Sequence, residues 1–217
     1  MSFATPVAPR EIPPLPDALG ETLGVFGESA RALERFGRLL AHANASMNLV
    51  GAASLDEFWT RHVLDCAQLL RLAPQARTWA DLGSGAGLPG LVLAILLKER
   101  PEVRVHLVES AAKRCRFLDQ VVAELGLPAE IHHRRAEGMA LRVEVVTARA
   151  CAPLDRLLGF AGGFLREGAR GLFLKGAGVQ AEISQARKRW RFDCETFESL
   201  SDPRGRVLSV TGVCRAP

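Results

Sequence analysis

The strongest indication of the fold of this chain is the segment Ala80-Asp81-Leu82-Gly83-Ser84-Gly85-Ala86-Gly87-Leu88-Pro89-Gly90. It follows a short apolar run, and it places four glycines within eight residues. Glycine has no Cβ and accepts positive φ, so it lets the backbone turn tightly and approach a ligand closely. The stretch therefore predicts a strand that turns sharply into a helix beside a bound ligand.

After this turn, short apolar runs alternate with helical stretches, which is typical of βαβ units and a mostly parallel sheet. Apolar residues at helical spacing predict crossover helices over 117–125 and 154–165. The turn sequence at 202–205 predicts that the last two strands form an antiparallel hairpin. The predicted fold is α/β and Rossmann-like, with seven strands at 77–82, 103–109, 129–133, 143–148, 170–175, 191–197 and 206–214.

The first 75 residues have a different pattern. Residues 1–16 contain five prolines and predict a flexible arm without helix or strand. Apolar residues recur every three or four positions from Asp17 to Leu40, which predicts an amphipathic helix with Asp17 as its N-cap. A second helix is expected over 55–72. We therefore divide one structural domain into the arm, a helical layer over 17–75 and a Rossmann-like core over 76–217.

The composition is that of one globular domain: 217 residues, of which 48% are hydrophobic and 24% charged. It excludes disordered, collagen-like and small disulfide-rich proteins. The longest apolar run, 88–97, is too short for a membrane helix, and no secretory signal precedes it, so we expect a cytoplasmic protein. Five cysteines without a C-x-x-C pair predict neither disulfides nor structural zinc. A net charge of +4 permits a polyanionic partner without requiring one.

Two nucleotide cofactors compete for the glycine-rich turn. The dinucleotide pattern G-x-G-x-x-G would have to begin at Gly85, two residues late relative to the strand. The register that begins at Gly83 is preceded by Asp81, which would repel a pyrophosphate but suits the sulfonium and ammonium groups of S-adenosylmethionine. Glu109, at the end of the second strand, is expected to accept hydrogen bonds from ribose hydroxyls. We favour S-adenosylmethionine over NAD, bound by Asp81, Gly83, Gly85 and Glu109.

The loop after the fourth strand, 147–153, limits which methyl-transfer reactions the protein can catalyse. It lacks the Asn/Asp-Pro-Pro-aromatic sequence of amino-group methyltransferases, and the chain contains no Tyr, so exocyclic amine methylation is disfavoured. Cys151 leaves open C5-pyrimidine methylation through a thiolate, although a small buried cysteine is the commoner role. A guanine N7 carries a free lone pair and needs positioning rather than a general base. The candidate catalytic residues for that reaction are Arg149, Lys175 and Ser84.

Six groups of residues together make the chain similar to one family. They are Asn48-Leu49; Arg61-His62-Val63-Leu64-Asp65; Asp81 to Gly90; Lys113-Arg114 before Phe117-Leu118; Arg149-Ala150 with Ala152-Pro153-Leu154; and Leu174-Lys175-Gly176. From about Leu33 to Val213 the chain resembles the glucose-inhibited division protein B family of small-subunit ribosomal RNA guanine-N7 methyltransferases. The resemblance implies a class I methyltransferase fold with an N-terminal helical layer, acting on a guanine in the decoding-region loop of 16S rRNA.

The resemblance also implies where ligands bind. It places S-adenosylmethionine against Gly83, Leu88, Glu109, Ser110, Ala136, Glu137 and Arg149. Arg61 and His62 would join the catalytic group at the mouth of the site. Because phosphates supply most of the affinity for RNA, we also expect Asn48, Lys113, Arg114 and Arg116 to contact RNA, with the basic runs at 132–135 and 187–191 as alternatives. We expect a monomer that acts on 16S rRNA or the small ribosomal subunit, and no metal, because the adjacent His132 and His133 point to opposite faces of a strand. A noncatalytic ribosome-assembly factor with this fold is the alternative from another class.

Overall fold

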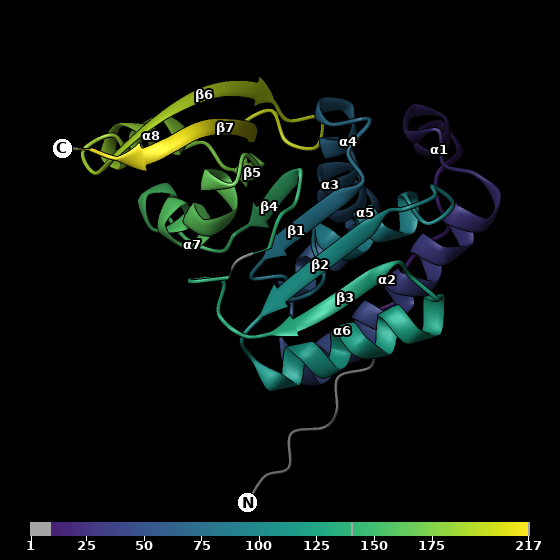
Figure 1. The fold of residues 1–217 in the computed structure, drawn as a ribbon. Coiled ribbons are helices and arrows are strands. Elements are labelled where there is room, and N and C mark those ends of the chain that lie inside the picture. The colour runs from purple at the N-terminus through teal and green to yellow at the C-terminus, as the bar shows by residue number, and fades with distance from the viewer. Residues whose placement is uncertain (1–9, 140, 217) are drawn as a thin grey trace, which may run out of the picture.

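A seven-stranded sheet lies at the centre of the protein, in the order β3-β2-β1-β4-β5-β7-β6. The computed structural model describes residues 10–139 and 141–216. The first five strands in that order are parallel, and β7 runs antiparallel to both β5 and β6 (Figure 1). The strands are β1 Thr78–Leu82, β2 Arg104–Glu109, β3 Ala129–His133, β4 Val145–Arg149, β5 Arg170–Lys175, β6 Trp190–Glu198 and β7 Arg206–Arg215. The predicted strands and the C-terminal hairpin are confirmed.

Helices cover both faces of the sheet, and each face carries its own hydrophobic core. The N-terminal helices pack with α5 and α6 on one face, and α7 packs with α8 on the other (Figure 1). The helices are α1 Asp17–Leu23, α2 Gly27–Met47, α5 Gly90–Leu96, α6 Ala112–Leu125, α7 Leu154–Arg166 and α8 Val179–Ala186. Within the part of the chain that the structure describes, no helix combines the length and apolarity that crossing a membrane requires.

The single helix expected from Asp17 to Leu40 is instead two helices. Gly24 has a φ of 63° and ends α1, while its amide and that of Val25 bond back to carbonyls of the last turn. A left-handed glycine is a common helix C-cap, so the periodic apolar pattern continues across a break in the backbone. The N-cap prediction was also wrong, because Pro16 occupies that position and Asp17 is the first helical residue.

The second expected helix, 55–72, is confirmed over 58–72, although its segments differ in helix type. They are a 3₁₀ turn η1 Ala52–Leu55, a π-helical segment η2 Phe58–Leu64, and two short helices, α3 Asp65–Ala67 and α4 Leu69–Leu72. Five of the seven residues in η2 are buried, which is more than one stripe of a regular α-helix can bury. The wider π-turn brings His62 inward together with its apolar neighbours, and such turns often occur at functional sites.

The described part of the expected flexible arm, 10–16, is packed against the helical layer. The guanidinium of Arg10 lies 2.6 Å from the Asp56 carboxylate, and the indole of Trp59 donates a hydrogen bond to the carbonyl of Pro13 at 2.8 Å. Ile12 packs against the core. The prolines do exclude helix and strand here, but a flexible arm was wrong for 10–16; residues 1–9 lie outside the described residues.

The connection from β3 to β4 differs from the other parallel crossovers. Its described residues, 134–139 and 141–144, form turns and bends without a helix. The preceding connection, by contrast, contains α6, which packs against β2 and β3 on one face of the sheet.

Candidate methyl-transfer site

The glycine-rich turn follows β1 and is held by its neighbour β2. The amides of Gly83 and Ser84 both donate to the carbonyl of Val108, at 2.8 and 3.1 Å. Gly83, Gly85 and Gly87 have φ values of 67°, 53° and 83°, which L-residues with a Cβ rarely adopt. The predicted strand-to-helix turn is therefore confirmed, and its conformation explains the spacing of the glycines.

Two of these glycines are also required by close packing. A Cβ on Gly90 would lie 2.3 Å from a methyl carbon of Leu107 and 2.9 Å from Cβ of Asp81. A Cβ on Gly83 would lie 2.8 Å from Sγ of Cys151, which belongs to the loop after β4. The absence of side chains thus keeps a cradle at the carboxyl ends of β1 and β4, where ligands bind in parallel sheets.

Asp81 lies beneath this cradle rather than at its surface. Its side chain is 1% exposed, and its carboxylate accepts hydrogen bonds from the amide of Gly90 at 3.2 Å and the hydroxyl of Thr147 at 3.0 Å. Burial raises the pKa of Asp81 from 3.8 to about 6, and these hydrogen bonds oppose the rise. The carboxylate therefore holds the turn against α5 and β4.

Glu109 joins the turn to the start of α6. One carboxylate oxygen accepts from the amides of Ser110 and Ala111, at 2.7 and 2.8 Å, and the other accepts from the amide of Gly85 at 3.0 Å. An ionised carboxylate offers about four acceptor positions, so these bonds leave capacity for a further donor such as a hydroxyl. The expected position of Glu109, at the carboxyl end of β2 and beside the glycines, is confirmed.

The other residues expected to contact the cofactor divide into two groups. Ser110 is exposed, Ala136 is half-buried and Glu137 is exposed, and all three follow strand ends next to Glu109. Leu88 is different, because its side chain is 4% exposed and belongs to the hydrophobic core.

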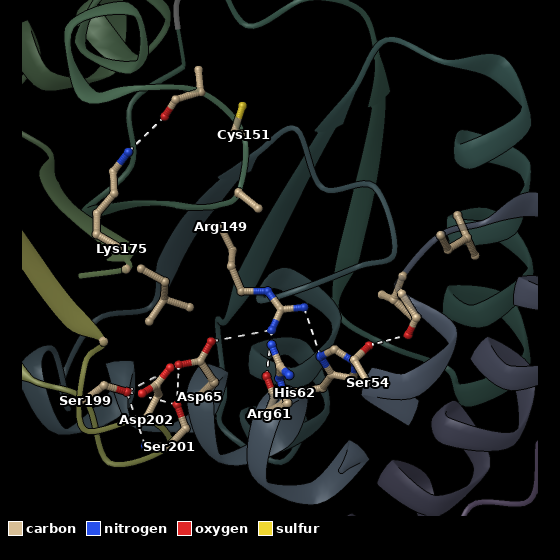
Figure 2. Close-up of a pocket in the computed structure, with 18 of the residues that line it drawn as sticks. Ser54, Arg61, His62, Asp65, Arg149, Cys151, Lys175, Ser199, Ser201 and Asp202 are labelled. Atoms are coloured by element: carbon tan, nitrogen blue, oxygen red, sulfur yellow. Dashed lines mark hydrogen bonds and ion pairs between the residues drawn. The ribbon is translucent and has the colours of Figure 1, made fainter. Parts of the chain in front are cut away.

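A cavity of about 970 Å³ opens beside the cradle, between the helical layer and the ends of β4 and β5 (Figure 2). Arg149 points into it from β4 and is anchored by the helical layer. One of its terminal nitrogens donates to the carbonyl of Arg61 at 2.8 Å and lies 3.4 Å from Asp65, and the other lies 3.1 Å from Nδ1 of His62. The structure thus places the Arg61-to-Asp65 motif beside Arg149 on the wall of this cavity.

The hydrogen-bond chain assigns the protonation state of His62. Arg149 is only a donor, so Nδ1 of His62 accepts, and Nε2 then carries the proton towards the hydroxyl of Ser54 at 3.0 Å. The Ser54 hydroxyl donates onward to the carbonyl of Gly51. Burial, with the charges of Arg149 and Arg61, lowers the pKa of His62 to about 3, so this imidazole is neutral.

The C-terminal hairpin supplies the far side of the same network. Oδ1 of Asp65 accepts from the hydroxyl of Ser201 at 2.6 Å and from the side-chain nitrogen Nε2 of Gln68 at 3.1 Å. The side-chain oxygen of Gln68 also accepts from the backbone amide of Leu200 at 2.9 Å, which attaches the β6–β7 turn to the helical layer. Sequence reasoning missed Ser54, Gln68 and Ser201, because no local pattern marks polar residues that meet only in the folded chain.

Two expected catalytic residues have structural contacts. Nζ of Lys175 is 2.8 Å from both the carbonyl of Ala152 and the carboxylate of Glu182, and Glu182 also accepts from the first amide of α7. The Ser84 hydroxyl, 2% exposed, donates to the carbonyl of Asp81 at 2.9 Å. Lys175 lines the cavity and fixes the loop after β4, whereas Ser84 faces inward and is unsuited to the catalytic role expected from the sequence.

The thiol of Cys151 lines the cavity but is a poor nucleophile. Partial burial raises its pKa, and the nearby charges of Asp81 and Glu109 raise it further, while Lys175 opposes them. Because the thiolate is the reactive form, this environment disfavours covalent attack on a pyrimidine. The alternative that used Cys151 is therefore not supported.

The residues expected to contact RNA lie where α2 ends and α6 begins. Asn48 caps α2 with a φ of 48°, and the amine of Lys113 donates to the carbonyl of Ser46 at 2.9 Å, so the two helix ends are adjacent. Arg114 lies 3.6 Å from the Glu109 carboxylate, and Arg116 is exposed on the same helix. These residues form one exposed group next to the cofactor cradle.

The fold and this cradle define a class I S-adenosylmethionine-dependent methyltransferase. The structure is similar to a methyltransferase of that description from Aquifex aeolicus, with a TM-score of 0.55 and 15% identity over 80% of this chain and 98% of that one. It is also similar to a putative O-methyltransferase from Klebsiella pneumoniae, with a TM-score of 0.57 and 14% identity over 90% and 96% of the two chains. At these identities the similarity establishes the fold.

Sequence comparison identifies the family. The model for GidB, described as rRNA small subunit methyltransferase G, matches residues 29–205. A ribosomal RNA small subunit methyltransferase G from Caulobacter vibrioides is 59% identical over 193 residues, 89% of each chain, and one from Parvibaculum lavamentivorans is 50% identical over 87% of this chain and 85% of its own. The chain belongs to the rRNA small subunit methyltransferase G family.

Proposed function

We propose that this protein transfers the methyl group of S-adenosylmethionine to N7 of a guanine in the decoding-region loop of 16S rRNA. Family membership supports the cofactor and the ribosomal substrate. The further choice of N7 rests on the residues that line the cavity. We also propose that the protein acts in the cytoplasm as a monomer.

The observation that carries the proposal is the state of the acid–base groups on the cavity wall. Among the described lining residues, the carboxylates of Asp65, Glu182 and Asp202 each accept hydrogen bonds, and His62 is neutral with Nδ1 engaged by Arg149. Arg149 occupies the basic nitrogen of His62, and the carboxylates of Asp65 and Glu182 are paired with Arg149 and Lys175, so these three groups hold the cavity wall together. Guanine N7 has an available lone pair and requires no proton to be removed, unlike an exocyclic amine or a hydroxyl.

The cradle fits S-adenosylmethionine, which supplies an electrophilic methyl group on a positively charged sulfur. The side-chain-free surface at Gly83 and Gly85 would admit the ligand, and the remaining acceptor capacity of Glu109 would hold its ribose hydroxyls. Ser110, Ala136 and Glu137 would border the adenine end. Asp81 and Leu88 would act from below by shaping the turn.

Arg149 would orient the guanine. Its hydrogen bonds to the helical layer use three of five N–H groups, so Nε and one proton of the second terminal nitrogen have no partner among the described residues. A guanidinium donor matches guanine O6, and donation to O6 alone leaves the N7 lone pair free to attack. Asn48, Lys113, Arg114 and Arg116 would contact phosphates and hold the RNA loop in place.

The test is methyl transfer from labelled S-adenosylmethionine to small subunits from cells that lack this gene, with the modified nucleoside identified by mass spectrometry. We expect 7-methylguanosine at one position. Arg149→Ala should lower turnover about a hundredfold, the usual effect of losing a preorganised donor. Label in a pyrimidine would return the mechanism to Cys151. Tight binding of both ligands without transfer would favour the assembly-factor alternative.

A further inference from the structure

Three potential metal ligands meet on the face of the sheet opposite α6. Val105 and Leu107 of β2 are buried in the core that α6 shares, so His106, between them, points to the other face. On β3, Glu130 is the register partner of His106, and His132 is two residues further along on the same face. In the described residues, 134–139 and 141–144, no helix follows β3 (Figure 1).

We propose that Nδ1 of His106, Nε2 of His132 and the carboxylate of Glu130 bind a divalent transition-metal ion, with Zn²⁺ the best match. The two imidazole nitrogens are 3.0 Å apart, and each lies 3.7 Å from an oxygen of Glu130. Ligand atoms of a tetrahedral zinc ion, bonded at about 2.0–2.1 Å, are separated by about 3.3 Å. The observed distances lie on either side of that value, so small rotamer changes bring all three atoms onto one ion.

The chemistry of the three ligands selects the metal. Imidazole nitrogen suits zinc, copper and nickel, whereas magnesium and calcium prefer oxygen ligands only. Two histidines and one glutamate form a common set of three protein ligands for zinc, with a fourth position left for water. All three residues are on paired strands, which hold their backbones in a constant relative position.

The charge around the cluster also suits a cation. The Glu130 carboxylate brings a negative charge to within 3.7 Å of both imidazole nitrogens. Arg104, on the same face of β2, opposes a cation, and the Glu130 carboxylate offsets that charge. The prediction of no metal rested on the spacing of the cysteines and on His132 with His133, which alternate across the strand, and it did not include His106 on the neighbouring strand.

The ion would connect the edge strand β3 to β2. None of the three ligands lines the cavity at Arg149, so the ion has no part in methyl transfer. Its effect would be on stability, because an ion that binds the folded protein and not the unfolded chain raises the unfolding temperature. Metal binding and methyl transfer can therefore be measured separately.

Calorimetric titration of the full-length protein with zinc chloride tests the site. We expect one ion per chain and a higher unfolding temperature in its presence. His106→Ala, His132→Ala and Glu130→Gln should each weaken binding by at least about tenfold, the scale on which metal-site mutations act. His133→Ala is the matched control, because this exposed histidine is adjacent in sequence but points to the opposite face.

The four variants distinguish the proposed site from zinc binding elsewhere on the chain. Glu130 is 66% exposed, so Glu130→Gln tests the site without threatening the fold. Zinc held by cysteine thiols would bind all four variants equally, and that result would overturn the proposal, as would a wild-type protein that binds no zinc. Cobalt(II) absorption gives a second readout, since imidazole and carboxylate ligands lack the intense thiolate-to-metal bands. Both His106→Ala and His132→Ala should lose the cobalt spectrum if the two histidines bind one ion. If both variants fold and only His106→Ala loses the spectrum, the proposal of a shared ion is contradicted.

Discussion

Replacement of Asp81 by Asn should change how the stability of this protein depends on pH. The carboxylate is buried, and its pKa is raised from 3.8 to about 6 in the folded protein. A raised pKa means that the folded state binds the proton more tightly than the unfolded chain does, so stability is greatest below 3.8 and is lost as pH rises through about 6. The difference between these two values corresponds to about 3 kcal/mol.

Asn cannot ionise, but it preserves the shape of the group. Its oxygen can accept from Gly90, and its amide can donate to the hydroxyl of Thr147. Between pH 4.5 and 7.5, the linkage relation predicts that wild type loses about 2 kcal/mol through this group. The free energy of unfolding of Asp81→Asn minus that of wild type should therefore increase by about 2 kcal/mol from pH 4.5 to pH 7.5. The new hydrogen bonds of Asn shift this difference by the same amount at every pH, so they do not affect its increase.

Urea unfolding followed by circular dichroism at successive pH values measures this difference directly. Asp119→Asn is a matched control, because its side chain is exposed on α6, and it should follow wild type throughout. Parallel curves for Asp81→Asn and wild type, or a difference that falls with pH, would refute the argument that burial dominates the titration of Asp81.

Three further predictions concern the site. Gly83→Ala should weaken S-adenosylmethionine binding about tenfold in calorimetry, because the added Cβ would lie 2.8 Å from Sγ of Cys151 at a backbone φ of 67°. Gly168→Ala is the control: its φ of 94° is also strained, but the added Cβ would meet no atom within 4 Å, so cofactor affinity should not change. Because His62 has a pKa of about 3 and stays neutral, kcat should show no His62 titration between pH 8 and 5.5; a decline near 6.5 that His62→Gln abolishes would contradict this. Lys175→Met should leave the Glu182 carboxylate without its ion-pair partner and lower the free energy of unfolding, measured in urea, by about 2–3 kcal/mol. The double variant Lys175→Met/Glu182→Gln should recover part of this lost stability, because it removes the unpaired charge.

The N-terminal layer is part of the site rather than a cover for it. Arg149 reaches the cavity from β4, but its hydrogen bonds and ion pair are with Arg61, His62 and Asp65 of the helical layer. Asp65 in turn is held by the β6–β7 turn through Ser201. Three segments distant in sequence therefore determine the direction of one guanidinium.

Features that depend on local backbone chemistry can be predicted from the amino-acid sequence of this protein. The seven strands, the antiparallel hairpin and the crossover helices follow from apolar periodicity, and the structure has them within a few residues of the predicted positions. The turn from Gly83 to Gly90 follows from the conformations that only glycine adopts readily. Glu109 was located correctly, because the end of a parallel strand places a residue at the ligand edge of the sheet.

Which side chains meet, by contrast, depends on how the elements pack in three dimensions. The packing of residues 10–16 against the helical layer depends on contacts that apolar periodicity does not encode. Ser84 faces the protein interior because its hydroxyl is required by the backbone of the turn. The pairing of His106 with His132 depends on the register of β2 and β3, which are joined through α6. The sequence of a strand indicates which face of the sheet a residue occupies, but not which residue of the neighbouring strand lies beside it.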